Sequence, residues 1–198
     1  MTLEGLGLRR SYSDWGPVVI LVPVGATVSV VIDEELVLTM VHDTGIRRLQ
    51  AAYADVCNRR AWGELEELFL PDTALVVDQR SKDELRFIGP AEAGRFIGTS
   101  VDQFEFFEFV VLNAHIVFPD GPGGGSAVGR MFMCEHRQDR IAGRWTDIYG
   151  IYHDRYALLD GRWWFADRRY SSLGRDARNA DVFAFPDPPP FDVPGPGR

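Results

Sequence analysis

The chain has 198 residues, of which 45% are hydrophobic and 12% aromatic, enough for one domain with a sizeable core. Its formal net charge of −8 argues against a nucleic-acid partner, because phosphate backbones require a basic surface. The two cysteines, Cys57 and Cys134, form no CxxC motif, which argues against a structural disulfide and fits a cytoplasmic protein. The apolar run at 18–31 is too short to span a bilayer, so we expect no membrane partner.

Residues 1–39 contain Gly, Pro and Val without a helical period. We expect them to form an N-terminal extension, either as a strand or as a free arm. The main domain is expected over residues 40–175, because a helical pattern begins shortly after Met40.

The segment from residue 46 to residue 58 predicts the first helix of this domain. Its apolar side chains follow 3, 4, 3 spacing, which is one stripe of an amphipathic helix. Asp43 or Thr44 is expected to cap its N-terminus, and basic residues at 59–60 favour its end. Tyr53 lies on the buried stripe, so its hydroxyl can reach into a pocket. The stripe consists of Ile46, Leu49, Tyr53 and Val56.

Two short helices and one strand are expected next. A helix over 62–69 ends at Pro71, and the β-branched segment 73–77 predicts a strand. A charged loop at 79–84 precedes a third helix over 89–97, which has Pro at an early helical position.

Long strands dominate the rest of the domain. The turn signals are the glycine-rich loop at 121–125 and Asp160-Gly161. This order predicts an α+β fold, a cone-shaped curved antiparallel sheet with three N-terminal helices packed on its concave face. The expected strands are 106–118, 127–136, 146–159 and 162–171.

The proline-rich tail at 176–198 excludes a helix and the interior of a strand. It either dangles or lies extended across a surface. Two aromatic residues, Phe183 and Phe185, favour docking of the tail on the domain.

Three segments carry a family resemblance: IRRLQAAYADVCNRRAWGELEELFLPDTALV, the strand at 106–118, and GIYHDRYALLDGRWWFADRRY. Together they resemble the SnoaL-like branch of the nuclear transport factor 2-like superfamily over roughly 41–172. The resemblance implies a small hydrophobic molecule as ligand and a homodimer or other homo-oligomer. It does not fix the activity, because this fold hosts polyketide cyclases, scytalone dehydratase, ketosteroid isomerase and non-catalytic binding proteins.

The catalytic pair of the dehydratase-like relatives is absent. In those relatives an Asp follows the helix Tyr or Lys by five residues, and a strand His precedes an Asn by four. The matching positions here hold Tyr53, Asn58, Phe109 and Asn113. Neither an amide nor a phenyl ring can act as a general base.

A ketosteroid-isomerase-like arrangement offers another acid and base. It matches Tyr53 and places Asp154 as a proton donor, unless Asp154 pairs with an arginine such as Arg155 or Arg169. The base position falls one residue before Asp78, whose side chain would need a bulge to reach the pocket.

His115 is a second candidate for proton transfer. By strand alternation it shares a face with Phe109 and Asn113. It could therefore replace the missing histidine.

The sequence favours a SnoaL-like pocket protein that acts as a cofactor-free lyase or isomerase on a small apolar or polycyclic molecule. Tyr53 would stabilise an oxyanion, and Asp154 or His115 would transfer the proton. No tight metal-ligand spacing is present, so neither a metal nor a cofactor is expected. Two alternatives stay open: a non-catalytic binding protein, and the small subunit of a ring-hydroxylating dioxygenase. The expected substrate-binding residues are Asn58, Trp62, Phe109, Asn113 and Trp145.

Overall fold

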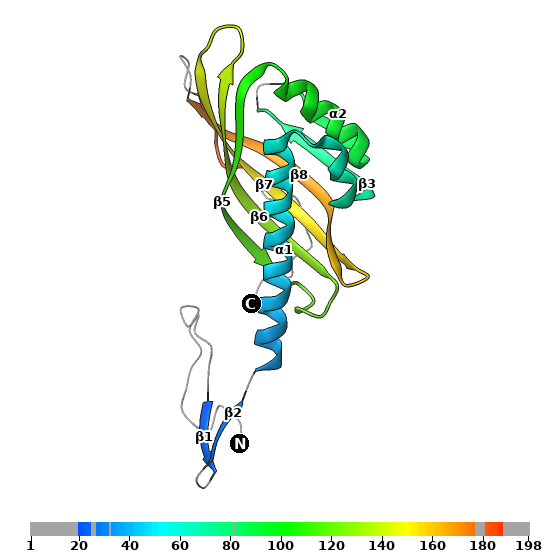
Figure 1. Cartoon of the computed structure of the whole chain (residues 1–198), viewed down its shortest axis with the longest axis vertical. Coiled ribbons are helices and arrows are strands. Elements are labelled where there is room, and N and C mark those ends of the chain that lie inside the picture. The colour runs from blue at the N-terminus through cyan, green and yellow to red at the C-terminus, as the bar shows by residue number, and fades with distance from the viewer. Residues whose placement is uncertain (1–19, 25–26, 32, 81, 177–180, 188–198) are drawn as a thin grey trace. The chain divides into compact units, whose positions relative to one another are not determined.

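The computed structural model describes residues 20–24, 27–31, 33–80, 82–176 and 181–187. Contacts divide the chain into two compact units, Met1–Val41 and His42–Arg198. In the first unit, β1 (Ile20–Val24) and β2 (Thr27–Val31) form an antiparallel hairpin (Figure 1). This hairpin belongs to the predicted N-terminal extension, whose first 19 residues lie outside the described residues.

Helix α1 spans Glu34–Arg59 and begins earlier than predicted. Its cap is Asp33, whose Oδ1 accepts a hydrogen bond from the backbone N–H of Leu36 at 3.1 Å. The prediction of a cap at Asp43 or Thr44 is wrong, because Asp43 instead forms an ion pair with Arg47 one turn later, at 2.5 Å. A capping residue is tolerated inside a helix when its side chain finds such a partner.

A short 3₁₀ helix, η2 (Trp62–Glu67), and strand β3 (Phe69–Asp78) follow. Strand β3 begins earlier than predicted and includes Pro71. The pairing of β3 with β8 shifts register between Phe69 and Ala74. Pro71 therefore removes no hydrogen bond between the two strands. The residue expected to end the second helix lies instead within a strand.

Strand β4 (Leu85–Ile88) was not predicted, because it lies at a sheet edge and shows no alternation of buried and exposed residues. Helix α2 (Gly89–Val101) starts as predicted, with Pro at an early position, and runs one turn further.

The four long strands are confirmed; three have wider bounds than predicted, and β5 begins two residues earlier and ends one residue earlier. They are β5 (Phe104–Val117), β6 (Ser126–Asp139), β7 (Trp145–Leu159) and β8 (Arg162–Asp176).

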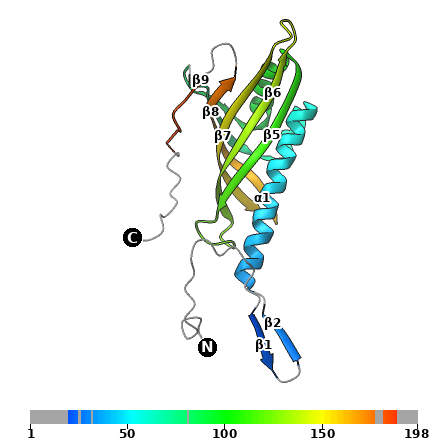
Figure 2. The same cartoon turned by 90° about the vertical axis from the view of Figure 1, so that its left-hand side faces the viewer.

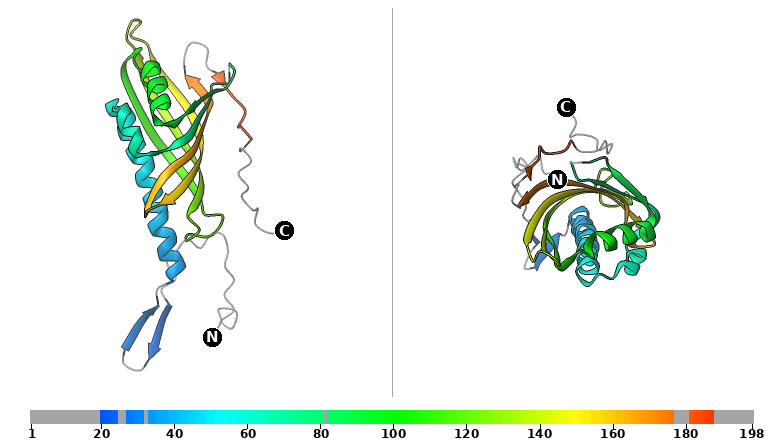
Figure 3. Two further views of the ribbon diagram at one scale, coloured as in Figure 1. Left: turned by 90° about the vertical axis from the view of Figure 1, so that its right-hand side faces the viewer. Right: turned by 90° about the horizontal axis from the view of Figure 1, so that it is seen from above.

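The main sheet has the order β4-β3-β8-β7-β6-β5, and every neighbouring pair is antiparallel except β3 and β8. It curves around the helices without closing, as the view from above shows (Figure 3). The predicted α+β class, the curved sheet and the three helices are confirmed.

Helix α1 lies against β5 (Figure 2). The Asn58 amide pairs with the backbone of Phe109, donating to its carbonyl at 3.1 Å and accepting from its N–H at 2.6 Å. Nη2 of Arg47 donates to the carbonyl of Ala114 at 3.2 Å. These contacts fix the helix along the edge strand, which otherwise presents unpaired backbone groups.

A β-bulge in β5 reverses the direction of the side chains that follow it. Val111 lies opposite Met133, whereas Asn113 lies opposite Phe132, so Leu112 is left without a partner. Since alternation has a period of two, one extra residue moves every later side chain to the other face.

A second bulge occurs in β8. Arg155 lies opposite Asp167, but Tyr156 lies opposite Phe165, which leaves Ala166 unpaired. Phe165 and Arg168 therefore both point to the concave side, and both are fully buried.

Part of the tail docks on the sheet, as predicted. Strand β9 (Asp181–Val182) pairs with the end of β8, and the Phe185 ring lies 6.0 Å from that of Phe132. The proline run at 188–190 lies outside the described residues.

Replacement of Gly150 by Ala should destabilise the domain. A Cβ at this position would overlap the Tyr170 ring and would lie 3.0 Å from Sδ of Met133. Overpacking of this kind costs about 1–3 kcal/mol, measurable by urea denaturation. Gly123→Ala is the control, because a Cβ there meets nothing within 4 Å. Equal stability of the two variants would contradict the packing around Gly150.

Candidate functional site

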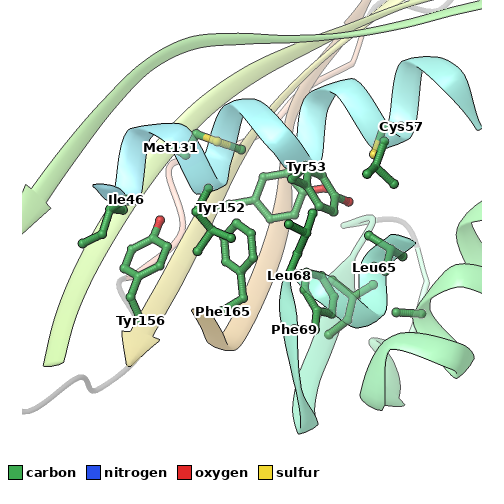
Figure 4. Close-up of a cluster of buried hydrophobic side chains, with 14 of the residues drawn as sticks. Ile46, Tyr53, Cys57, Leu65, Leu68, Phe69, Met131, Tyr152, Tyr156 and Phe165 are labelled. Carbon is green, nitrogen blue, oxygen red and sulfur yellow. The ribbon is translucent and has the colours of Figure 1, made fainter. Parts of the chain in front are cut away.

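Tyr53 projects from α1 into the aromatic core (Figure 4). The predicted apolar stripe is buried at each of its positions, which confirms the helical period. The ring stacks on Phe69 at a centroid distance of 6.1 Å and meets Phe109 edge-on at 5.4 Å. Burial raises the pKa of the Tyr53 phenol well above its ordinary value. The hydroxyl therefore stays protonated at neutral pH and can donate a hydrogen bond.

The guanidinium of Arg168 lies inside this aromatic cluster. Its Cζ is 4.0 Å from the ring centroids of Tyr53 and Tyr152, and 4.2 Å from that of Phe165. Its Nη1 has no hydrogen-bond partner in the described part of the chain. Desolvated cation–π contacts contribute about 2 kcal/mol or more, so the ring faces stabilise the buried cation.

Asp154 neutralises Arg168. Nε of Arg168 lies 3.1 Å from Oδ1 of Asp154, and Nη2 donates to Oδ2 at 3.4 Å. Tyr156 donates to the same Oδ2 at 2.9 Å, and its own hydroxyl accepts from Gln50 at 2.7 Å. Burial raises the pKa of Asp154 to about 6, opposed by Arg168 and Tyr156. The carboxylate is therefore ionised at neutral pH, and the network ties α1 to β7 and β8.

A pocket with a volume of about 210 Å³ lies between α1, α2 and the concave face of the sheet. A cavity on the order of 150 Å³ holds a benzene-sized molecule, so this pocket suits a molecule of one or two rings. Tyr53 and Cys57 of α1 line one side of it. The apolar lining also includes Val77, Phe96, Phe104, Phe109 and Ile148.

Three charged side chains line the same pocket: Glu135, Arg137 and Arg175. Glu135 lies opposite Phe109 in the sheet and keeps 20% of its side-chain surface exposed. Nη1 of Arg137 lies 3.5 Å from Oε2 of Glu135. Burial raises the pKa of Glu135, while Arg137 lowers it in part. Glu135 is thus a pocket carboxyl able to exchange a proton nearer neutral pH than an ordinary Glu.

The pocket also contains a pair of phenols. Tyr53 and Tyr152 both line the pocket, their ring centroids lie 6.2 Å apart, and burial raises the pKa of both phenols. The negative charge of Glu135 raises the pKa of Tyr152 further, so the carboxyl and the phenol are close enough to interact. Two neutral hydroxyl donors and one carboxyl therefore meet in one apolar chamber.

Asp154 faces the concave side but is not part of the pocket wall. Its partner is Arg168, whereas the sequence suggested Arg155 or Arg169. The bulge at Ala166 explains the difference, because it turns Arg168 inward at the position opposite Asp154. Asp154 thus belongs to the buried network beneath the pocket.

The prediction that His115 and Asn113 share a face with Phe109 is wrong. Phe109 is buried and lines the pocket, but His115 and Asn113 are both exposed. They follow the bulge at Leu112 and therefore point to the convex side. Neither residue can reach a ligand in the pocket.

Three other predicted binding residues lie outside the pocket wall. The amide of Asn58 is occupied by the backbone of Phe109. Trp62 packs on α2, where a Cβ at Gly98 would lie 3.0 Å from its Nε1. Trp145 is 55% exposed.

Of the predicted site residues, Tyr53 and Phe109 meet at the pocket. Glu135, Arg137 and Arg168 were not predicted from the sequence. Strand alternation could have predicted that Glu135 and Arg137 face inward, because they lie on the same strand face as Met131 and Met133, which are both fully buried. The orientation of Arg168 depends on a bulge, for which the sequence shows no marker.

In the described ranges, no group of three or more His, Cys, Asp or Glu side chains could hold a metal ion. Within the same ranges, no helix combines the length and apolar character needed to cross a membrane.

A family model for the SnoaL-like domain matches residues 41–169. Among curated proteins, no match was found.

Solved structures with the same fold include three from the genus Novosphingobium. A candidate scytalone dehydratase from N. aromaticivorans is 17% identical, with a TM-score of 0.63 over 77% of this chain and 99% of its own. The hexachlorocyclohexane dehydrochlorinase LinA-type3 from N. barchaimii is 16% identical, with a TM-score of 0.62 over 76% and 99%. A candidate aromatic ring hydroxylase from N. aromaticivorans is 17% identical, with a TM-score of 0.56 over 68% and 90%.

Asp154→Asn should lower the free energy of unfolding by about 3–5 kcal/mol, because it leaves the Arg168 charge buried without a counter-ion. The measurement is urea denaturation at neutral pH. Asp167→Asn is the matched control: Asp167 pairs with Arg155 at 3.1 Å, but both side chains are exposed, so the loss should stay below about 1 kcal/mol. A similarly small decrease in the free energy of unfolding of both variants would show that the buried pair of Asp154 and Arg168 does not stabilise the fold as proposed.

Proposed function

The chain belongs to the SnoaL-like domain family, and on this premise we propose that it is a cofactor-free lyase or isomerase for a small ring-containing molecule. One observation carries the proposal: the pocket places Glu135, whose pKa is raised by burial, in the same chamber as the hydroxyls of Tyr53 and Tyr152. A carboxyl with a raised pKa is a competent base, and neutral phenols are competent donors to an oxyanion.

The chemistry follows from these roles. Glu135 takes a proton from a carbon next to a carbonyl, and the electron pair of that C–H bond moves toward the carbonyl oxygen. Tyr53, whose hydroxyl stays protonated, donates a hydrogen bond to the resulting enolate oxygen. In an isomerase, Glu135 returns the proton to a different carbon. In a lyase, the enolate re-forms the carbonyl and expels a leaving group with its electron pair from the β-carbon.

Pocket size narrows the substrate class. The volume of about 210 Å³ is smaller than the roughly 300–1,000 Å³ typical of pockets for drug-sized ligands. It favours a molecule of one or two rings over the polycyclic substrates that the family resemblance also allowed. The aromatic walls provide apolar contacts for such a ring.

Two of the structural neighbours support a lyase reaction. Their names, a dehydratase and a dehydrochlorinase, both denote elimination of a small leaving group. Sequence identity to both is below 20%, so the likeness in fold leaves the choice of substrate to the residues of this chain.

A second candidate function is binding without catalysis. It is favoured by the two side chains at the family's acid–base positions. The amide of Asn58 is occupied by the backbone of Phe109, and the phenyl ring of Phe109 cannot transfer a proton. A ligand that raises the melting temperature and is recovered unchanged would support this function over the first.

Self-association and a cytoplasmic location stay predictions from the sequence. Sedimentation velocity tests the first, with a dimer mass as the expected result.

Glu135→Gln should reduce turnover by about 10²–10⁴-fold, because the amide cannot accept a proton. The assay is the isomerisation of 3-cyclohexenone to the conjugated 2-cyclohexenone, followed by ultraviolet absorbance. Activity of the natural chain should rise with pH through a pKa above the ordinary Glu value, because the base works in its deprotonated form. Glu108→Gln, an exposed acid on β5, is the control. Retention of full activity by Glu135→Gln would exclude Glu135 as the base.

Tyr53→Phe should reduce turnover of the same ketone by about 10²–10³-fold, because it removes the oxyanion donor and keeps the ring. Circular dichroism should show an unchanged fold. Tyr149→Phe, which removes a hydroxyl from a residue that is 42% exposed, should leave the rate unchanged. Equal rates for all three chains would rule out this role of Tyr53.

A further inference from the structure

The charges in the pocket form an ordered row across the sheet. Phe109, Glu135, Ile148 and Arg175 lie directly opposite one another on β5, β6, β7 and β8, and all four line the pocket. Because adjacent strands lie about 4.8 Å apart, the backbones of Glu135 and Arg175 are separated by roughly 10 Å, about the width of one ring with a substituent. Arg137 follows Glu135 on the same face of β6, one side-chain repeat further along the strand.

Neither arginine is saturated by the protein. Nε of Arg137 is buried without a hydrogen-bond partner in the described part of the chain, and its contact with Glu135 is long, at 3.5 Å. Arg175 donates through Nη2 to a neutral group, the carbonyl of Gln79, at 2.9 Å. Among the described residues, no carboxylate lies within ion-pair distance of Arg175. Guanidinium groups in such partly buried positions gain most from a charged, two-oxygen acceptor.

The balance of charge in the pocket points the same way. With Glu135 ionised, the three charged side chains sum to +1, and protonation of Glu135 increases this excess. The whole chain carries −8, so a positive pocket runs against its composition. A ligand with a single negative charge would neutralise the site, whereas a neutral ligand would leave an uncompensated cation beside its apolar ring.

From this arrangement we propose that the ligand is an anion: a one- or two-ring molecule carrying a carboxylate, which Arg175 and Arg137 hold while the ring lies against Phe109 and Ile148. The inference rests on the proposed function of this pocket and names its substrate class. Held in this way, the carboxylate anchors one end of the molecule at the arginines. The ring then extends along the row toward Glu135, so that a carbon activated by a ketone of the same molecule can lie beside this base.

The test compares two probes of nearly equal shape, phenylacetate and phenylacetamide, by isothermal titration calorimetry on the full chain. We expect phenylacetate to bind at least about tenfold more tightly, with an affinity that falls as the salt concentration rises. In Arg175→Met the preference for the anion should shrink by about tenfold or more. Arg137→Lys keeps the charge but loses the planar fork, and should retain part of the preference. Arg130→Met, at an exposed position on β6, is the control and should behave as the natural chain.

The outcomes distinguish failure of the anion inference from failure of the proposed pocket function. If phenylacetamide binds as tightly as phenylacetate, the anion inference is wrong, while the small-molecule pocket stands. If neither probe binds at millimolar concentration, the pocket function fails and the inference with it. If Arg175→Met loses its fold by circular dichroism, the salt dependence and the two-probe ratio of the natural chain still decide the question.

Discussion

The buried ion pair between Asp154 and Arg168 is the interaction on which the rest of the site depends. An arginine at this depth is tolerated only because a carboxylate and three ring faces compensate its charge. The same contacts fix the rings of Tyr53 and Tyr152, since the guanidinium lies 4.0 Å from both. The phenols that line the pocket are thus held in place by a charged group that is not part of the pocket wall.

Strand bulges decide which charges enter this interior. The bulge at Ala166 turns Arg168 inward to meet Asp154, and the bulge at Leu112 turns His115 outward. Each adds one residue to one strand and reverses the faces of the residues that follow, up to the next bulge, which in β8 lies at Leu173. The chemistry of the site, without a histidine and with Glu135 as its pocket carboxyl, is therefore a consequence of register as much as of residue type.

The dependence on register explains which features of the site could be predicted from the sequence. The buried stripe of α1 and the four long strands were predicted correctly, because periods of 3.6 and 2 are local properties of the chain. The place of Tyr53 in the core followed from the same period. The partner of Asp154 and the direction of His115 could not be predicted, because a bulge is set by pairing with a distant strand. The start of α1 was missed because Asp33 and Asp43 offer equal capping chemistry, and only the fold selects between them.

The proposed function depends on Glu135 as a pocket carboxyl whose proton equilibrium responds to burial and to the ligand. The most direct measurement is a pH titration of the side-chain carboxyl carbons by nuclear magnetic resonance, with the Glu135 signal assigned from its absence in Glu135→Gln. We expect a pKa for Glu135 above the ordinary glutamate value, and a further change in this pKa when phenylacetate is added. A pKa at or below the ordinary glutamate value, unchanged by phenylacetate, would contradict the proposed role of Glu135.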